Sequence, residues 1–156
     1  MVPVEANEVS LSGVFFEREN MNAGKGMSTS LTHYFTGHFG FTADADILKS
    51  DFALFREYGY RAGPTVTFLR SYRVQPFAHF LMGYSRFKEI NTGPQRPYVS
   101  GFSYMPGGGA DVRLIGSVFA RVAIDGEVDP DTGPSVTHVM RLSFGLNYKF
   151  GRQRSY

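Results

Sequence analysis

The stretch that decides the fold is VMRLSFGLNYKF, residues 139–150. Apolar and polar residues alternate along it without a break, and a period of two indicates a β-strand. One face carries Met140, Leu142, Phe144, Leu146, Tyr148 and Phe150, and the other carries Arg141, Ser143, Gly145, Asn147 and Lys149. In a soluble sheet the apolar face would form the core. In a membrane barrel the apolar face would meet lipid and the polar face would line the lumen.

The composition fits one domain that is rich in strands and turns. The chain has 156 residues, of which 18 are glycine and 8 are proline, and only 19% are charged. The absence of cysteine excludes disulfides and thiolate metal sites. A net charge of +2 without a basic run gives no reason to expect a nucleic-acid partner. No apolar run reaches the ~18–20 residues of a membrane helix.

Seven further segments alternate in the same way, so we predict eight strands of ~8–12 residues, close to the ~9–11 that cross a bilayer at a tilt. The predicted strands are residues 9–17, 27–36, 39–48, 60–69, 77–87, 102–114, 118–125 and 139–150. Four long loops, at 18–26, 49–59, 88–101 and 126–138, alternate with three short connections at 36–38, 70–75 and 115–117. This asymmetry is typical of outer-membrane barrels, and it predicts that both termini lie on the short-turn, periplasmic side.

The polar faces of the predicted strands carry charges of both signs. Reflecting the hairpins about Gly37 and Gly116 places Ser30 opposite Asp44, Tyr34 opposite Gly40 and Asp111 opposite Arg121; a symmetric loop would place Asp46 opposite Arg61. The predicted lumen network comprises Asp44, Asp46, Arg61, Asp111, Arg113, Arg121, Asp125, Arg141 and Lys149. The interior of an eight-stranded barrel is just wide enough for side chains. Because an unpaired buried charge costs several kcal/mol, the near balance of sign predicts ion pairs that plug the lumen.

With these segments in place, the chain resembles the small bacterial outer-membrane barrels that include the OmpA membrane domain, OmpX and OmpW-like proteins. The resemblance spans residues 8–150 and rests on Tyr34-Phe35, Phe39-Gly40-Phe41, Asp44, Gly63-Pro64, Pro76-Phe77-Ala78-His79, Gly107-Gly108-Gly109-Ala110-Asp111 and the terminal strand. It implies an all-β, eight-stranded, antiparallel up-and-down transmembrane β-barrel in one domain, residues 1–156, with a short basic tail at 151–156. The chain departs from the pattern because it runs past the terminal aromatic and has no following peptidoglycan-binding domain.

The same resemblance implies a location and partners. The protein would be a monomer in a Gram-negative outer membrane, in contact with lipid and lipopolysaccharide. The barrel-assembly machinery would recognise the last strand through Gly145, Tyr148 and Phe150. No signal peptide opens the sequence, so an exported protein would be present here in its mature form. The group shares no reaction, so the resemblance implies an architecture and a location rather than a specific task.

Candidate chemical sites are few. Asp125, Glu127, Asp129 and Asp131 precede Gly133, and such oxygen clusters can bind calcium. Pro130 interrupts the spacing, so a solvated acidic loop is the default interpretation and we predict no metal site. His33 lies near Thr29 and Thr32 without a serine at a convincing spacing, and we predict no catalytic residue and no cofactor. His79 is interpreted as a hydrogen-bonded lumen residue.

Other residues suggest features of the barrel wall. Pro64 and Pro106 lie inside strands, where proline removes a ladder donor. Pro106 beside three glycines predicts a bulge or a sharp coil in the barrel wall, with the approach of a ligand to the bare backbone as the less favoured alternative. Aromatic residues near the strand ends predict interfacial girdles: Phe15, Phe35, Phe39, Tyr60, Phe87, Phe102, Tyr148 and Phe150. Cations on the long-loop side would either meet lipopolysaccharide phosphates or be scattered surface charge: Arg18, Lys25, Lys49, Arg56, Arg86, Lys88 and Arg96.

The favoured hypothesis is therefore an outer-membrane barrel with a plugged lumen and a structural or surface-interaction role. Three alternatives stay open. A soluble lipocalin-like barrel would need an apolar lumen and a polar exterior. A small channel would need an open lumen, and a lipid-active enzyme would need a nucleophile on the lipid face.

Overall fold

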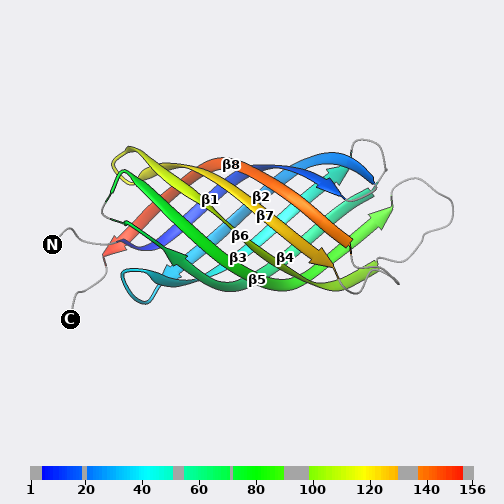
Figure 1. Ribbon diagram of the computed structural model, residues 1–156, viewed down its shortest axis with the longest axis horizontal. Coiled ribbons are helices and arrows are strands. Elements are labelled where there is room, and N and C mark those ends of the chain that lie inside the picture. Colours follow the sequence, from blue (N-terminus) through cyan, green and yellow to red (C-terminus); the bar gives the residue numbers. More distant parts are fainter. Residues whose placement is uncertain are drawn as a thin grey trace.

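The computed structural model describes residues 5–18, 21–50, 55–70, 72–89, 99–129 and 137–152. They form eight strands: β1 Glu5–Arg18, β2 Met21–Tyr34, β3 Phe39–Ser50, β4 Phe55–Thr67, β5 Val74–Glu89, β6 Val99–Ile115, β7 Val118–Asp129 and β8 Thr137–Arg152. Each strand pairs antiparallel with its neighbours in sequence, and β8 returns to β1 to close the barrel (Figure 1). The predicted fold class is therefore confirmed. Among the described residues, no helix is long and apolar enough to cross a membrane.

The burial of side chains is the reverse of that in a soluble barrel. In β8, Leu146 is 56% exposed, whereas its neighbours Asn147 and Lys149 are 0% and 2% exposed. The same alternation runs around the barrel, with large apolar side chains outside and polar side chains inside. Some apolar side chains also lie inside the barrel: Val14, Phe16, Leu48 and Val139 form a small cluster, and Phe77, Leu81, Met105 and Phe119 are buried elsewhere.

Most of the predicted register is correct. The structure pairs Ser30 with Asp44, Tyr34 with Gly40, and Asp111 with Arg121. One register is wrong, because Arg61 lies opposite Asp44, while Asp46 lies opposite Gly59. The predicted partner of Arg61 is displaced by two residues along β3. Because side chains alternate with a period of two, Asp44 and Asp46 both still point into the lumen.

The strands are longer than predicted at one end of the barrel. β1 ends at Arg18 and β2 begins at Met21, so the predicted loop 18–26 belongs mostly to strands. Similarly, β3 ends at Ser50 and β4 begins at Phe55. Only the connections at 90–98 and 130–136 are long, so the prediction of four long loops is wrong. Both termini lie at the end of the barrel that carries the connections 35–38, 68–73 and 116–117 (Figure 1).

The glycines of β2 explain why its first half was not predicted as a strand. A Cβ at Gly24 would lie 2.4 Å from the Phe16 ring, and one at Gly26 would lie 2.8 Å from Leu48 Cδ2. The two glycines therefore make room for the apolar cluster inside the barrel. Their presence removes the side-chain alternation that a sequence pattern relies on.

The prolines do not mark bulges. Pro64 pairs with Phe41 and Pro106 pairs with Phe80, and neither ladder shifts register at that position. Register shifts occur instead between Glu17 and Arg18 and between Arg113 and Ile115. Neither proline shifts the register of its strand, so of the two alternatives predicted at Pro106 the bulge is wrong.

The turns at the terminal end are tight. β6 and β7 are joined by residues 116–117, and Gly116 adopts φ = 53°, the left-handed region that favours glycine. This turn fixes the β6–β7 register that brings Asp111 beside Arg121. At the C-terminus, β8 extends through Arg152, so the tail predicted at 151–156 begins inside a strand, and its remainder lies outside the described residues.

Candidate functional site

The lumen holds a set of buried charges that forms the candidate site. Its carboxylates are Glu8, Asp44, Asp46, Glu57, Asp111, Asp125 and Glu127, and its cations are Arg61, Arg121, Arg141 and Lys149. The contacts divide this set into two networks and one histidine pair, stacked along the barrel axis. We call them the terminal-end network, the loop-end network and the His79–Asp125 pair.

The terminal-end network joins Glu8, Asp111, Arg121, Asn147 and Lys149. Arg121 donates through Nε to Asp111 Oδ1 at 2.7 Å and through Nη2 to Asp111 Oδ2 at 2.8 Å. Its Nη2 also donates to Glu8 Oε2 at 2.9 Å. Lys149 Nζ lies 2.9 Å from an oxygen of each of these two carboxylates, and Asn147 Nδ2 donates to both. Two acids and two bases thus neutralise each other across β1, β6, β7 and β8.

Aromatic and amide side chains enclose the terminal-end network. Lys149 Nζ lies 4.4 Å from the centre of the Phe119 ring and donates to Gln75 Oε1 at 2.7 Å. The Arg121 guanidinium lies 4.5 Å from the centre of the Phe77 ring. Phe119 is 1% exposed and Phe77 is 5% exposed, so these contacts replace water around the cations.

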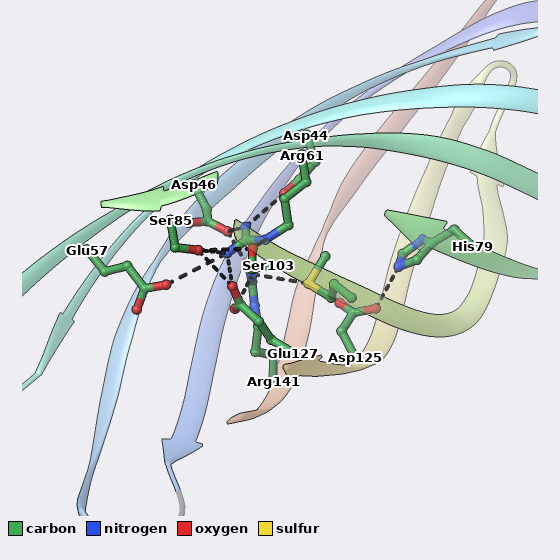
Figure 2. A network of polar contacts seen from close by, with 11 residues as sticks. Asp44, Asp46, Glu57, Arg61, His79, Ser85, Ser103, Asp125, Glu127 and Arg141 are labelled. Carbon is green, nitrogen blue, oxygen red and sulfur yellow. Dashed lines mark hydrogen bonds and ion pairs between the residues drawn. The ribbon is translucent and has the colours of Figure 1, made fainter. Parts of the chain in front are cut away.

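The loop-end network joins Asp46, Glu57, Arg61, Glu127 and Arg141 (Figure 2). Asp46 Oδ2 accepts from Arg61 Nη1 at 2.6 Å and lies 2.7 Å from Arg141 Nη1. Arg61 also donates to Glu127, and Arg141 Nη1 lies 3.4 Å from Glu127 Oε2. Asp46 and Glu127 therefore bridge the two guanidinium groups, which would otherwise repel each other.

Hydroxyl groups complete the loop-end network. Arg61 donates through Nη2 to Ser85 Oγ at 2.9 Å and through Nε to Ser103 Oγ at 3.2 Å. Ser85 donates to Glu127 Oε1 at 3.0 Å. Both serines are 0% exposed. The Arg61 guanidinium is thus held from four strands, β3, β4, β5 and β6, with Glu127 reaching it from β7.

Along β7, Asp125 lies between Arg121 of the terminal-end network and Glu127 of the loop-end network. Figure 2 shows the His79–Asp125 pair beside the loop-end network. His79 Nε2 is 2.8 Å from Asp125 Oδ1, which agrees with the prediction that His79 is a hydrogen-bonded lumen residue. Both residues line a cavity of only ≈ 40 Å³ inside the barrel. A volume of that size holds a few water molecules and no larger solute.

Two glycines provide the space that these charges need. A Cβ at Gly107 would lie 1.8 Å from Asp125 Oδ1, and one at Gly59 would lie 2.3 Å from Arg61 Nη1. Gly107 lies beside Asp125 of the neighbouring strand β7, whereas Gly59 lies beside Arg61 of its own strand and Asp46 of β3. The lumen is therefore packed tightly enough that a single methyl group would displace a charge.

The structure brings together most of the predicted network, in two groups. Asp46, Arg61 and Arg141 lie in the loop-end network, while Asp111, Arg121 and Lys149 lie in the terminal-end network. Asp44 Oδ1 is 3.9 Å from Arg61 Nη1. Arg113 does not join either network: it is exposed at the terminal end, where its guanidinium lies 5.3 Å from the centre of the Phe119 ring.

Three carboxylates of the lumen were missed as lumen residues: Glu8, Glu57 and Glu127. Each one continues the two-residue period of a strand, Glu8 before Ser10, Glu57 before Arg61 and Glu127 after Asp125. Longer predicted strands would have included them. Among the described side chains, the two networks, Asp44 and the His79–Asp125 pair hold seven carboxylates and four Arg or Lys cations, so the near balance of the predicted set does not hold for this larger set. The surplus lies in the loop-end network and its neighbour Asp44.

The other chemical candidates have simple structural explanations. Asp125 and Glu127, considered for a calcium loop, point into the lumen and are engaged there; the side chains of Asp129 and Asp131 lie outside the described set. Within the described residues, no group of three or more histidines and carboxylates is arranged to hold a metal ion. On the outer wall, His33 Nδ1 contacts Asn7 Oδ1 at 2.8 Å.

The residues of the terminal strand signal lie at the seam of the barrel. Gly145 faces Ser12 of β1, where an added Cβ would lie 2.1 Å from Leu11 O, so the close approach requires glycine. Tyr148 and Phe150 point outward, and their rings stack with centres 5.9 Å apart. The predicted girdle residues whose side chains are described are all exposed, namely Phe15, Phe35, Phe39, Tyr60, Phe102, Tyr148 and Phe150.

A closed antiparallel barrel with an apolar exterior and a charged interior has the architecture of a transmembrane β-barrel. Comparison with solved structures agrees. The fold is similar to Neisserial surface protein A (15% identity, 92% of this chain and 97% of that chain covered, TM-score 0.79). It is also similar to OprG from Pseudomonas aeruginosa (10% identity, 95% of this chain and 97% of that chain covered, TM-score 0.67). A third similar structure is the N-terminal barrel domain of OprF from the same organism (14% identity, 92% of this chain and 99% of that chain covered, TM-score 0.65). These likenesses confirm the predicted resemblance to small outer-membrane barrels at the level of the fold.

Sequence comparison adds no closer relationship. No protein-family model matches the chain, and no curated protein shows a significant match.

The Asp111–Arg121 contact predicts a specific result in a double-mutant cycle. Arg121→Leu should cost about 3–5 kcal/mol of stability, because it leaves Asp111 and Glu8 with Lys149 as their only cation in the network. Adding Asp111→Leu should restore part of the loss. Urea unfolding of refolded protein in detergent measures both variants and the double variant. Strictly additive losses would show that the two side chains do not interact.

The loop-end network predicts a contrast between two neighbouring aspartates. Asp46→Asn should cost about 3 kcal/mol, because it weakens close contacts with two buried guanidinium groups. Asp44→Asn should stay within about 1 kcal/mol of the wild type, because Asp44 is 3.9 Å from its nearest cation and belongs to a surplus of negative charge. The same unfolding assay compares them. Equal losses for the two variants would contradict the network described here.

Proposed function

We propose that this protein is an integral β-barrel of the Gram-negative outer membrane, with both termini on the periplasmic side. The observation that carries the proposal is the inverted alternation of side chains. Leu11, Met27, Leu31, Ile47, Ile124, Met140 and Leu146 are all more than half exposed, whereas Arg61, Arg141 and Lys149 are 2% exposed. Such an exterior is stable in hydrocarbon and unfavourable in water.

Within that membrane, we propose a structural or surface-interaction role with a plugged lumen. The two buried networks and the enclosed rings fill the interior across its length, and the cavity between them is ≈ 40 Å³. An eight-stranded barrel has no further space for an aqueous pathway. The long connections at 90–98 and 130–136, on the side away from the termini, would carry any contact with partners outside the cell.

The proposal includes recognition of β8 by the barrel-assembly machinery. Gly145 at the β1–β8 seam and the stacked, outward Tyr148 and Phe150 support this role for the last strand. No enzymatic activity is part of the proposal. A lipocalin-like ligand-binding role is disfavoured, since the interior here is charged and the exterior is apolar.

The membrane location predicts a depth-dependent cost of charge on the outer wall. Leu142→Arg, inside β8, should cost about 2–4 kcal/mol in lipid bilayers, whereas Ile115→Arg, at the terminal end of β6, should cost about 0–1 kcal/mol. Unfolding in urea from phospholipid vesicles measures both. A stable, folded monomer in detergent-free buffer would contradict the membrane location.

The plugged lumen predicts that the protein does not conduct ions across a membrane. Refolded wild-type protein in planar bilayers should produce no steady current at either polarity, because the networks leave no continuous water path. A large porin in the same chamber serves as the positive control. A reproducible open level of the wild-type protein would show that it is a small channel instead.

A further inference from the structure

The exposed cations of the barrel are arranged in register on one sector of its outer wall. Lys25 of β2 lies opposite Lys49 of β3, and Lys49 lies opposite Arg56 of β4. Arg86 of β5 lies one pleat further from the loop end, opposite Tyr58. All four cations are exposed and point outward. We call them the cation row.

The cation row is costly on its own, because like charges directly opposite each other in a sheet are destabilising. On β2, β3, β4 and β5, no outward-facing described side chain is an aspartate or glutamate; at the edge of the row, Glu17 of β1 is exposed opposite Ala23, one pleat from Lys25. On the opposite sector, the outward described residues of β6, β7 and β8 near the loop end include no lysine or arginine. A ligand that carries negative charge would therefore bind on one side of the barrel.

An apolar hollow lies below the cation row on the same strands. Leu31, Ala43, Ala62 and Met82 form one cross-strand line, and Ala45 lies opposite Tyr60 in the adjacent line. The three alanines lie between large exposed side chains, so the wall is recessed there and forms an open hollow of ≈ 590 Å³. Its volume is within the ~300–1,000 Å³ typical of ligand sites.

The distance between the two features matches a lipid. Ala45 and Ala43 precede Lys49 by four and six residues along β3, which is about 13–20 Å along the strand at 3.3 Å per residue and about 10–15 Å along the barrel axis at a strand tilt of ~35–45°. Half of the hydrocarbon core is about 15 Å thick. The cation row at the loop end therefore lies at the depth of an anionic headgroup, and the hollow lies at the depth of its acyl chains.

We infer that this sector binds one molecule of a bisphosphorylated glycolipid of the lipid A type. The cation row would hold the phosphates, and an acyl chain would occupy the hollow. The row crosses three strand spacings, about 14 Å at 4.7–4.9 Å each, which is wider than a single phosphate requires. Arg and Lys both suit phosphate recognition. The inference rests on the proposed outer-membrane location, which places the loop end in the outer leaflet.

A second copy of the chain is a poorer occupant of the same surface. A symmetric dimer brings the same patch of both subunits together. In a membrane this would place one cation row against the other at the same depth, and juxtaposed like charges oppose association.

The test is a lipid titration of refolded protein in mild neutral detergent, followed by native mass spectrometry. Wild-type protein should bind one lipid A molecule, more tightly than phosphatidylglycerol or phosphatidylcholine. Lys49→Gln combined with Arg56→Gln should weaken lipid A binding by roughly tenfold, because two charge-assisted phosphate contacts are lost. The matched control is Arg73→Gln combined with Arg113→Gln, which removes two exposed cations at the opposite end and should leave binding unchanged.

A second pair of variants tests the hollow. Ala45→Phe fills it and should weaken lipid A binding, whereas Ala78→Phe, on the outer wall of β5 near the terminal end, should not. Equal weakening by both charge variants, equal weakening by both phenylalanine variants, or equal affinity for phosphatidylglycerol would overturn the inference. Circular dichroism and insertion into phosphatidylcholine vesicles separate the two proposals: a protein that inserts but binds no lipid A contradicts the inference alone, and one that does not insert contradicts the membrane location and the inference with it.

Discussion

The pairing of buried charges inside the barrel is the constraint on which the rest of this structure depends. Arg61, Arg121 and Arg141 each reach carboxylates on other strands, and no single strand supplies a complete set of partners. The cost of stranding one member of a buried pair exceeds the net benefit of forming it. The contacts therefore favour the arrangement in which the correct residues of neighbouring strands lie opposite each other, more than they add to the free energy of unfolding.

The same constraint explains the glycines that face the lumen. Gly59 and Gly107 leave room for Arg61 and for Asp125, and Gly145 allows β8 to approach β1 closely at the seam. In these positions glycine costs strand propensity. At Gly59 and Gly107 charged side chains occupy the volume that a larger residue would need, and at Gly145 the backbone of β1 and Ser12 occupy it.

Much of the fold could be predicted from the sequence because successive side chains of a barrel strand point to opposite faces, which gives the sequence a two-residue period. β8 and β7 show this period clearly, and the tight turn at Gly116 was enough to pair Asp111 with Arg121. The prediction failed where the period carries no signal. Residues 21–26 of β2 are held as a strand by pairing with β1 and β3 rather than by side-chain pattern. The partner of Arg61 depended on a connection whose length could not be derived from its residues, and Glu57 and Glu127 were lost with the strand ends that contain them.

The proposal makes one claim about each face of the barrel wall: outward side chains meet lipid, and inward side chains are packed away from bulk water. Because the chain has no cysteine, single cysteines can report on each face without a background. The most direct measurement is the labelling of Ser143→Cys, facing the lumen, and Leu142→Cys, facing outward, in protein refolded into phospholipid vesicles. The account predicts that Ser143→Cys is protected from a bulky water-soluble maleimide, and that a small fluorophore on Leu142→Cys, attached before refolding, is quenched by spin-labelled lipid chains. Rapid labelling of Ser143→Cys in the folded protein, or a fluorophore on Leu142→Cys that lipid chains do not quench, would contradict it.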